Sequence, residues 1–226
     1  MAMTYLFENL TVIDAASFVA GPGAATIFAD FGAKVIKVEA PAGDAYRLLH
    51  GRHRSDYNWA LTSRNKQDIA IDLYQEEGRA IMHRLLDQAD VLILNFREDQ
   101  LKQFELTYDE LKQRNPELIV AQLTAFGTRG PDRERRGYDT TAWWARTGIT
   151  DLLKPHQRSP TVPLGGVGDH ASAMTLFAGI MMALYQRDRT GEGGYVQTSL
   201  TANGCWSNGM HLQGAIAGFD LSELLD

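Results

Sequence analysis

Residues 11–38 read TVIDAASFVAGPGAATIFADFGAKVIKV. Two short apolar runs, at residues 11–14 and 34–38, flank a segment of small residues at 23–31 that has helical spacing. Gly32 follows that segment, and a glycine just after a helical pattern is a common helix stop. The stretch therefore predicts a strand, a helix and a second strand, which is the unit that builds parallel sheets.

The same alternation continues along the chain. It predicts further strands at residues 68–73, 90–95, 118–123 and 194–200, and helices at 76–88, 108–115, 169–189 and 201–216. Residues 127–137 are rich in turn formers and predict a loop. We therefore expect an α/β fold with a mostly parallel sheet flanked by helices. Because 226 residues with 44% hydrophobic content can bury a large core, we expect one domain over residues 1–226.

Composition excludes several classes of function. A formal charge of −6 opposes nonspecific binding to nucleic acid or to an anionic membrane. The single cysteine, Cys205, excludes an intrachain disulfide and fits a reducing cytosol. Residues 1–8 lack the pattern of a signal peptide, and we expect no apolar run to be long enough to span a bilayer. The sequence thus predicts a soluble, cytoplasmic protein.

A dinucleotide-binding fingerprint is weakly matched by Gly21-Pro22-Gly23, with Glu39 after the next strand. Thr26 occupies the third glycine position, and Pro22 lacks the backbone N–H that a pyrophosphate would need. A tight turn that packs the helix is the simpler interpretation. We expect no nicotinamide cofactor.

Metal ligands are sparse in the sequence. The nearest histidine pair, His50 and His53, falls in a predicted loop without a set of further ligands. We expect no bound metal.

The segment Gly165-Gly166-Val167-Gly168-Asp169-His170 places a carboxylate at the start of a long predicted helix. The helix dipole and the free N–H groups there favour the anionic form of Asp169. Two roles fit that position: Asp is a favoured N-cap, and it is also a suitable nucleophile. His170 follows, but adjacent side chains on a helix diverge, so it stays unassigned.

A set of short segments resembles one enzyme family when read in order. The segments lie at residues 12–14, 20–22, 30–39, 64–66, 71–73, 95–97, 137–139, 168–169 and 189–193. Together, over nearly the whole chain, they resemble the N-terminal portion of the class III coenzyme A transferases of the CaiB/BaiF type. That superfamily also contains formyl-CoA transferase, carnitine CoA-transferase and α-methylacyl-CoA racemase. Their order and spacing, rather than any single motif, carry the resemblance.

The resemblance implies a Rossmann-like large domain whose smaller second domain is largely missing from this chain, so that the chain looks truncated at its C-terminus. It implies transfer of coenzyme A from an acyl-CoA donor to a free carboxylic acid acceptor, through covalent intermediates on Asp169. The exposed apolar surface left by the missing part implies a homodimer or a complementary subunit.

The resemblance also implies a coenzyme A site. The family positions that line it correspond to Val19, Ala20, Ala40, Ile71, Asp72, Leu73, Tyr74, Asn95, Phe96, Arg97, Arg136, Gly137, Tyr138 and Asp139. Arg97 or Arg136 would meet the phosphates. Three positions that are basic in the family are Ala40, Tyr74 and Gln103 here, so other cations would have to compensate; the candidates are Lys37, Lys66 and Lys102.

Two alternatives to a transferase remain open. The family's racemases use a histidine in a Gly-His-Asp motif as a base, and here that motif is Gly137-Tyr138-Asp139. A tyrosine is a poor replacement for histidine at neutral pH, which favours the transferase. The second alternative is a catalytically silent CoA-binding fragment or split subunit, because the chain is shorter than its family. Trp143-Trp144 would then either shape an acyl pocket or pack in the core.

Overall fold

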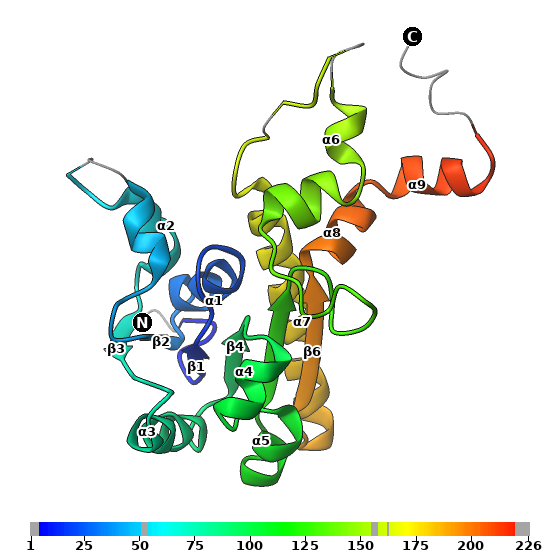
Figure 1. Ribbon diagram of the computed structural model, residues 1–226. Helices are drawn as coiled ribbons and strands as arrows, with labels where there is room; N and C mark the ends of the chain where they lie inside the picture. Colours follow the sequence, from blue (N-terminus) through cyan, green and yellow to red (C-terminus); the bar gives the residue numbers. More distant parts are fainter. Residues whose placement is uncertain (1–4, 51–53, 155–157, 162, 220–226) are drawn as a thin grey trace. The chain divides into compact units, whose positions relative to one another are not determined.

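The computed structural model describes residues 5–50, 54–154, 158–161 and 163–219 (Figure 1). The chain forms two compact units. Unit 1 is Met1–Leu123 with Ala173–Gln197, and unit 2 is Thr124–Ser172 with Thr198–Asp226. Three of the described elements continue from one unit into the other: β5 (Ile119–Thr124), α7 (Val167–Thr190) and β6 (Gly194–Ser199).

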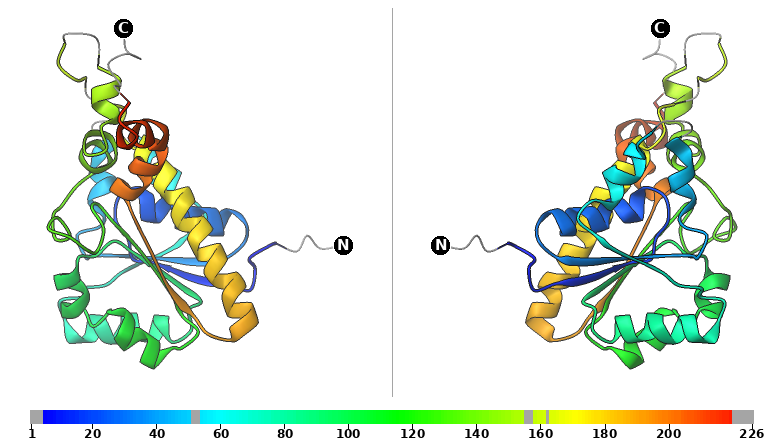
Figure 2. Two further views of the ribbon diagram at one scale, coloured as in Figure 1. Left: turned by 90° about the vertical axis from the view of Figure 1, so that its right-hand side faces the viewer. Right: turned by 90° about the vertical axis from the view of Figure 1, so that its left-hand side faces the viewer.

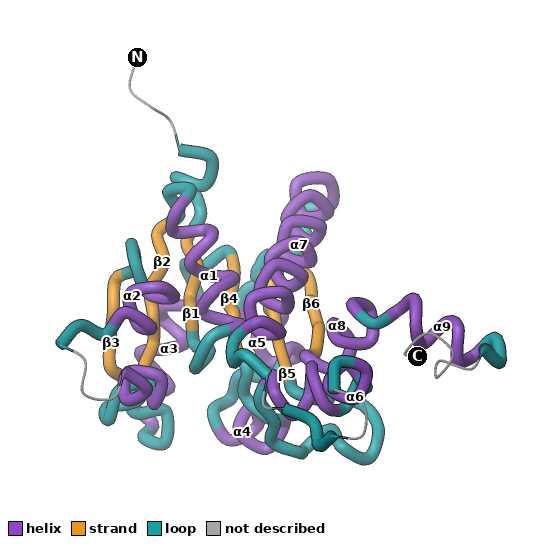
Figure 3. Tube along the Cα trace, turned by 90° about the horizontal axis from the view of Figure 1, so that it is seen from above, coloured by secondary structure: helices purple, strands orange, loops and turns teal. Residues whose placement is uncertain are grey.

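The sheet has the strands β1 (Thr11–Asp14), β2 (Lys34–Glu39), β3 (Gln67–Ala70), β4 (Val91–Leu94), β5 (Ile119–Thr124) and β6 (Gly194–Ser199). Their spatial order is β3-β2-β1-β4-β5-β6 (Figure 3). The pairs β1–β2, β1–β4, β2–β3 and β4–β5 are all parallel. The predicted α/β fold with a mostly parallel sheet is therefore confirmed. The order reverses between β1 and β4, which is where open α/β sheets bind ligands.

Helices cover both faces of the sheet in unit 1 (Figure 2). One face carries α1 (Ala20–Asp30) and the unit 1 part of α7 (Val167–Thr190). The aromatic ring of Phe28 in α1 packs against Phe177 in α7, with ring centroids 4.8 Å apart. The other face carries α3 (Glu76–Leu86), α4 (Glu98–Gln103) and α5 (Tyr108–Arg114).

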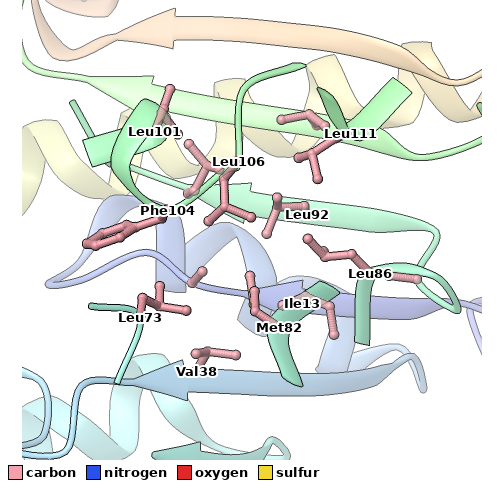
Figure 4. Close-up of a cluster of buried hydrophobic side chains, with 14 of the residues drawn as sticks. Ile13, Val38, Leu73, Met82, Leu86, Leu92, Leu101, Phe104, Leu106 and Leu111 are labelled. Atoms are coloured by element: carbon pink, nitrogen blue, oxygen red, sulfur yellow. The ribbon is translucent and has the colours of Figure 1, made fainter. Parts of the chain in front are cut away.

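One hydrophobic cluster lies between the sheet and α3, α4 and α5 (Figure 4). Ile13 and Leu92 point from the strands toward Met82 and Leu86 of α3, and each of these four side chains is fully buried. Burying such a side chain contributes roughly 1.5–3 kcal/mol, so this cluster fixes the sheet and the loops at its ends.

Helix α7 is longer and more apolar than expected. Among the described residues, it is the helix that could cross a membrane on length and composition alone. The prediction that no apolar run is long enough is therefore wrong on that criterion. Ala173, Leu176, Ile180 and Leu184 are buried at helical spacing, so one face of the helix packs within the protein, while Met174, Met182 and Tyr185 are exposed.

The start of α1 differs from the prediction. The helix begins at Ala20 rather than Gly23, and the N–H of Gly23 donates to the carbonyl of Val19 at 2.7 Å. Gly21-Pro22-Gly23 therefore forms the first helical turn and is not a tight turn. A Cβ on Gly21 would lie 2.3 Å from the Cβ of Ala16, so a glycine allows the helix to approach the loop before it.

Three short elements of unit 1 were not predicted, and one of them is α4. A 3₁₀ helix, η1 (Ala45–His50), and helix α2 (Tyr57–Ser63) lie between β2 and β3. Asp56 caps α2 by accepting a hydrogen bond from the N–H of Trp59 at 3.0 Å.

Unit 2 contains the π-helix η2 (Thr140–Ala145), α6 (Ile149–Leu152), the first turn of α7, α8 (Leu200–Ser207) and α9 (Gly209–Ile216). The prediction of one helix over residues 201–216 is wrong, because the helix breaks at Asn208. The buried side-chain amide of Asn208 donates to the carbonyl of Thr147 at 2.8 Å. This bond ties the break to the segment after η2.

Candidate active site

Asp169 lies in the first turn of α7, in unit 2. The helix begins at Val167, and its first backbone bond runs from the N–H of His170 to the carbonyl of Gly166 at 2.8 Å. Asp169 is therefore the third residue of the helix. The interpretation that it caps the helix is wrong, and its carboxylate is free of that role.

Glycines build the turn that presents Asp169. Gly166 has φ +86°, a left-handed conformation that side chains with a Cβ rarely adopt. A Cβ on Gly168 would lie 2.5 Å from Cγ of Trp143, so the indole ring leaves no room for one. Gly165, in contrast, has open space where a Cβ would lie. Two of the three glycines in the motif are thus required by geometry.

Asp139 supports the same turn. Its buried carboxylate accepts a hydrogen bond from the N–H of Gly166 at 2.7 Å. Asp139 directly precedes η2, in which the N–H of Arg146 donates to the carbonyl of Thr141 five residues earlier. Such π-turns are often found at functional sites. The sequence did not predict η2, since six residues with five-residue bonding have no distinct hydrophobic period.

The Asp169 carboxyl group has an unusual acidity. Burial raises its pKa, and the negative charge of nearby Asp139 raises it further, to about 7. This opposes the prediction that the helix N-terminus favours the anion, because desolvation outweighs the dipole at this position. Among the described residues, no hydrogen-bond donor contacts the Asp169 carboxylate. Both the protonated and the ionised form of Asp169 are therefore populated near neutral pH.

Ten of the predicted coenzyme A positions lie in unit 1, at the carboxyl ends of four strands. Ala40 follows β2, Ile71 follows β3, and Asn95 follows β4. Val19 and Ala20 come at the end of the loop after β1. Parallel strands bring these positions to one edge of the sheet, on both sides of the point where the strand order reverses. The prediction that they bind coenzyme A stays a prediction.

The side chains at these positions differ in their exposure to solvent. Val19, Ala20, Ile71 and Leu73 are buried, so they shape the edge from beneath. Exposed or partly exposed residues at the same edge are Ala40, Asp72, Tyr74, Asn95, Phe96 and Arg97. Arg97 precedes α4 and pairs with Asp99, with 2.7 Å between Nη2 and Oδ2.

The remaining four positions lie in unit 2, in the segment that leads to η2. Arg136 and Tyr138 are exposed. Gly137 lies against an aromatic ring, because a Cβ there would be 2.8 Å from Cε2 of Phe126. Asp139 is buried and holds Gly166. The sequence predicted Asp139 as a ligand-binding position, and the structure shows that its carboxylate also supports the turn before Asp169.

Two of the three lysines that were candidates for phosphate binding are unsuited to it. The side chains of Lys37 and Lys66 are 1% exposed and form ion pairs with buried aspartates. Lys102 is exposed and pairs with Glu98 across one helical turn. Of these lysines, Lys102 is therefore the one that a phosphate can reach.

The Glu39 carboxylate is also bound by other groups of the protein. Its carboxylate accepts hydrogen bonds from the Arg47 guanidinium, at 2.5 and 2.9 Å, and from the N–H of Asp44 at 2.6 Å. Arg47 in turn stacks over the ring of Trp59 at 3.5 Å. The acidic group that would bind a ribose in a dinucleotide-binding fold is thus already occupied.

The described residues hold no group of three or more His, Cys, Asp or Glu side chains that would suit a metal ion. The histidine pair at residues 50 and 53 lies outside the described side chains.

Comparison with known proteins assigns the family. A model of the CoA-transferase family III matches residues 7–223. The chain is 38% identical over 218 residues to cinnamoyl-CoA:phenyllactate CoA-transferase of Clostridium sporogenes, covering 94% of this chain and 53% of the relative. It is 35% identical over 201 residues to (R)-2-hydroxy-4-methylpentanoate CoA-transferase of Clostridioides difficile, covering 86% and 50%. The chain therefore belongs to the CoA-transferase family III.

Solved structures agree with this assignment. A CAIB/BAIF family protein from Brucella suis superimposes with a TM-score of 0.89 at 32% identity, covering 95% of this chain and 58% of that chain. Rv3272 from Mycobacterium tuberculosis gives a TM-score of 0.87 at 32% identity. The predicted family resemblance is confirmed, and the chain spans about half the length of the curated relatives that it matches.

Proposed function

We propose that this chain carries the nucleophile and the coenzyme A platform of an acyl-CoA:carboxylate CoA-transferase. The observation that carries the proposal is Asp169: a half-buried carboxylate, set in the first turn of a long helix by a turn that requires glycine. Relatives named as CoA-transferases support the reaction class, and the reaction on Asp169 is our inference.

The reaction begins when a carboxylate oxygen of Asp169 attacks the carbonyl carbon of the acyl-CoA thioester. The C–S bond breaks, which leaves a mixed anhydride on Asp169 and releases the coenzyme A thiolate. The thiolate then attacks the aspartyl carbonyl of the anhydride. The donor acid leaves as its carboxylate, and Asp169 becomes a thioester of coenzyme A.

The acceptor acid completes the exchange by the reverse steps. Its carboxylate attacks the aspartyl thioester to form a second anhydride and to free the thiolate. The thiolate attacks the acyl carbonyl of the acceptor, which gives the new acyl-CoA and restores the Asp169 carboxylate. No redox step or net proton transfer is needed, and the partly buried position of Asp169 limits loss of the intermediates to water.

Coenzyme A would bind at the carboxyl edge of the unit 1 sheet. The positions after β1, β2, β3 and β4 form that edge, and Arg97 at the start of α4 supplies a cation beside it. A single guanidinium group can donate two N–H groups to the oxygens of one phosphate, which fits the phosphates of coenzyme A.

The racemase alternative is less well supported. It needs a base beside Asp169, and the motif position for that base holds Tyr138, whose side chain is 59% exposed. A phenol group is a poor replacement for the imidazole of histidine as a base at neutral pH. Exchange of the α-hydrogen of a chiral 2-methylacyl-CoA for deuterium, without an acceptor acid, would favour the racemase.

We propose that the transferase works together with a second polypeptide, either another copy of this chain or a complementary subunit. Relatives named as the α and β subunits of succinyl-CoA–L-malate CoA-transferase, from Chloroflexus aurantiacus, support a subunit arrangement. We further propose a soluble, cytoplasmic location, where acyl-CoA and free acids are available.

Intact-mass spectrometry tests the proposal. The wild-type chain and Asp169→Ala are incubated with a panel of acyl-CoAs, and any adduct is mapped by peptide analysis. We expect a coenzyme A or acyl mass on Asp169 of the wild type and none in the variant. An adduct on another residue would contradict the assignment of the nucleophile. Binding of coenzyme A without any adduct would favour a silent binding subunit.

A further inference from the structure

A buried network of four charged side chains lies beneath the carboxyl edge of the sheet in unit 1. It consists of Asp14, Lys37, Asp44 and Lys66, whose side chains are all 0–1% exposed. Lys37 lies 3.9 Å from Asp14 and 3.4 Å from Asp44, and Lys66 lies 2.8 Å from Asp14. Asp14 and Asp44 are not among the predicted coenzyme A positions, and Lys37 and Lys66 are too deeply buried for the phosphate contacts considered for them.

This network contacts the loop between β1 and α1, residues 15–19. The ammonium group of Lys37 donates to the carbonyl of Ala16. The Asp44 carboxylate accepts from the N–H of Phe18, at 3.3 and 3.4 Å, and from the N–H of Tyr46. Asp14 accepts from the N–H of Ala16 at 3.2 Å. The charged groups therefore hold the backbone of the loop from below.

Lys66 extends the network to two helices. Its ammonium group donates to the carbonyl of Pro22 in the first turn of α1 at 2.8 Å, and to the carbonyl of Thr62 in α2 at 2.6 Å. With Asp14 as its third acceptor, all three of its N–H groups are used. Desolvation by burial lowers the pKa of Lys66, while the Asp14 charge opposes that shift.

The loop itself is strained. Phe18 has φ +67°, which is unusual for a residue other than glycine. Such conformations persist where the surrounding structure fixes them, and they concentrate at functional sites. Asn95 adds two more bonds from the other side: its amide accepts from the N–H of Ser17 and donates to the carbonyl of Ser17, both at 3.0 Å.

Stability alone is a poor reason for such a network. Replacing a buried ion pair by apolar residues is often neutral or stabilising, because desolvation of the charges offsets their attraction. A charged network does, however, favour one conformation of the groups it bonds. The loop that it fixes leads directly to Val19 and Ala20, at the sheet edge where ligands bind in this type of fold.

We propose that Asp14, Lys37, Asp44 and Lys66 form a preorganising frame, which holds loop 15–19 in the conformation that receives coenzyme A. Lys37 and Asp44 are its central positioning residues. They act through the backbone of the loop and do not bind the ligand themselves. This proposal rests on the proposed function, since it takes coenzyme A as the ligand at this edge.

The test uses the double variant Lys37→Met with Asp44→Asn, which removes one positive and one negative charge together. The pair of Asp14 and Lys66 remains balanced in it. The matched control is Arg114→Met with Asp87→Asn, which makes the same kind of change in an exposed ion pair of unit 1. That pair lies at the ends of α3 and α5, which precede β4 and β5 at the amino edge of the sheet.

Hydrogen–deuterium exchange and coenzyme A binding are measured on the wild type and both variants. In the double variant we expect the amides of residues 15–19 to exchange at least about tenfold faster, because the hydrogen bonds that hold this loop are lost. The amides of the core strands should stay protected. The dissociation constant of coenzyme A should rise about tenfold, because the loop must be ordered on binding. The control should match the wild type in both.

A kinetic readout separates positioning from general damage. The half-saturating acyl-CoA concentration for adduct formation at Asp169 should rise with the dissociation constant, while the maximal rate changes less than about twofold. If the double variant does not fold, Asp44→Asn alone is used, with an expected weakening of about threefold.

The outcomes distinguish the two proposals. A double variant that binds coenzyme A as the wild type does, or whose loop exchanges unchanged, overturns the frame and leaves the proposed function standing. A wild-type chain that does not bind coenzyme A overturns the proposed function and, with it, the ligand assigned to the frame.

Discussion

Two turns of this molecule are held in opposite ways. Loop 15–19 in unit 1 is fixed by side chains that come from β2 and from the segments after β2 and β4, far away in the sequence. The turn before Asp169 in unit 2 is fixed by its own glycines, with one side-chain bond from Asp139. The proposed binding surface is thus built from long-range contacts, whereas the position of the proposed nucleophile depends mainly on glycines next to it in the sequence.

The two units also shift the pKa of a carboxyl group in opposite directions. Burial disfavours the charge of Glu39, but hydrogen bonds from Arg47 and from the backbone outweigh that effect and lower its pKa to about 2. Asp169 has no such donor among the described residues, and its pKa is raised to about 7. In unit 1, Arg47 therefore compensates the charge of the buried Glu39 carboxylate. In unit 2, the Asp169 carboxyl group has no such partner among the described residues and stays available for the proposed reaction.

The largest effect is expected from Gly168→Ala. Its Cβ would lie 2.5 Å from the Trp143 ring, so we expect a loss of about 1–3 kcal/mol in the free energy of unfolding and a marked loss of adduct formation at Asp169. Gly165→Ala is the control, with an expected change within about 0.5 kcal/mol because the space around it is open. Denaturant unfolding measures both. Equal effects of the two substitutions would show that the turn is not encoded by Gly168.

Asn95→Leu tests the long-range clamp in unit 1. It removes two hydrogen bonds to Ser17, and we expect a loss of roughly 1–2 kcal/mol together with faster amide exchange in loop 15–19. Asn115→Leu also removes two bonds, to the carbonyls of Leu86 and Ala89, and serves as the control. It should lower stability without loosening the loop. If both variants loosened the loop equally, the clamp would not be specific to Asn95.

The pH dependence of adduct formation tests the carboxylate in unit 2. The reactive form of Asp169 is the anion, so a pKa of about 7 predicts a rate that rises with pH. Between pH 6 and pH 8 the ionised fraction, and thus the rate at saturating acyl-CoA, should increase about tenfold. Asp139→Asn removes the neighbouring negative charge and should move the midpoint to lower pH. A flat profile above pH 5 would contradict the raised pKa.

The last expected effect is on stability, and it is confined to a window of pH. Asp169 has a folded-state pKa of about 7 against an ordinary value of 3.8, so between these values the folded chain binds more protons than the unfolded chain. Its stabilising contribution is present at low pH and is lost as the pH rises through 7. Asp169→Asn should therefore gain stability relative to wild type over that window, by about 1–2 kcal/mol after solvent screening. Thermal unfolding at pH 5 and pH 8 measures the difference in stability between Asp169→Asn and wild type. A difference that shrinks as the pH rises would contradict the raised pKa.

Much of the sheet could be predicted from the sequence. The strand Thr11–Asp14 was predicted at its observed bounds, and the other strands within a few residues, because buried parallel strands form short apolar runs. Asp169 was found through its glycine motif, which the structure explains by the left-handed Gly166 and the crowded Gly168. Local backbone requirements of this kind leave a visible trace in the sequence.

Tertiary context determined what the sequence did not predict. The break at Asn208 depends on a bond to Thr147, and the burial of Lys37 and Lys66 depends on aspartates from other segments. The raised pKa of Asp169 depends on burial and on Asp139, which lies 30 residues earlier in the chain. None of these has a pattern in the neighbouring residues.

The indole ring against Gly168 gives the candidate active site its own optical signal. Trp143 is buried, and its N–H has no hydrogen-bond partner among the described residues. Indole emission responds to nearby charge, so a charge that appears or vanishes on Asp169 will alter the emission of Trp143. With Trp59, Trp144 and Trp206 replaced by phenylalanine, the remaining fluorescence would follow ionisation and acylation of Asp169 in real time, without a label.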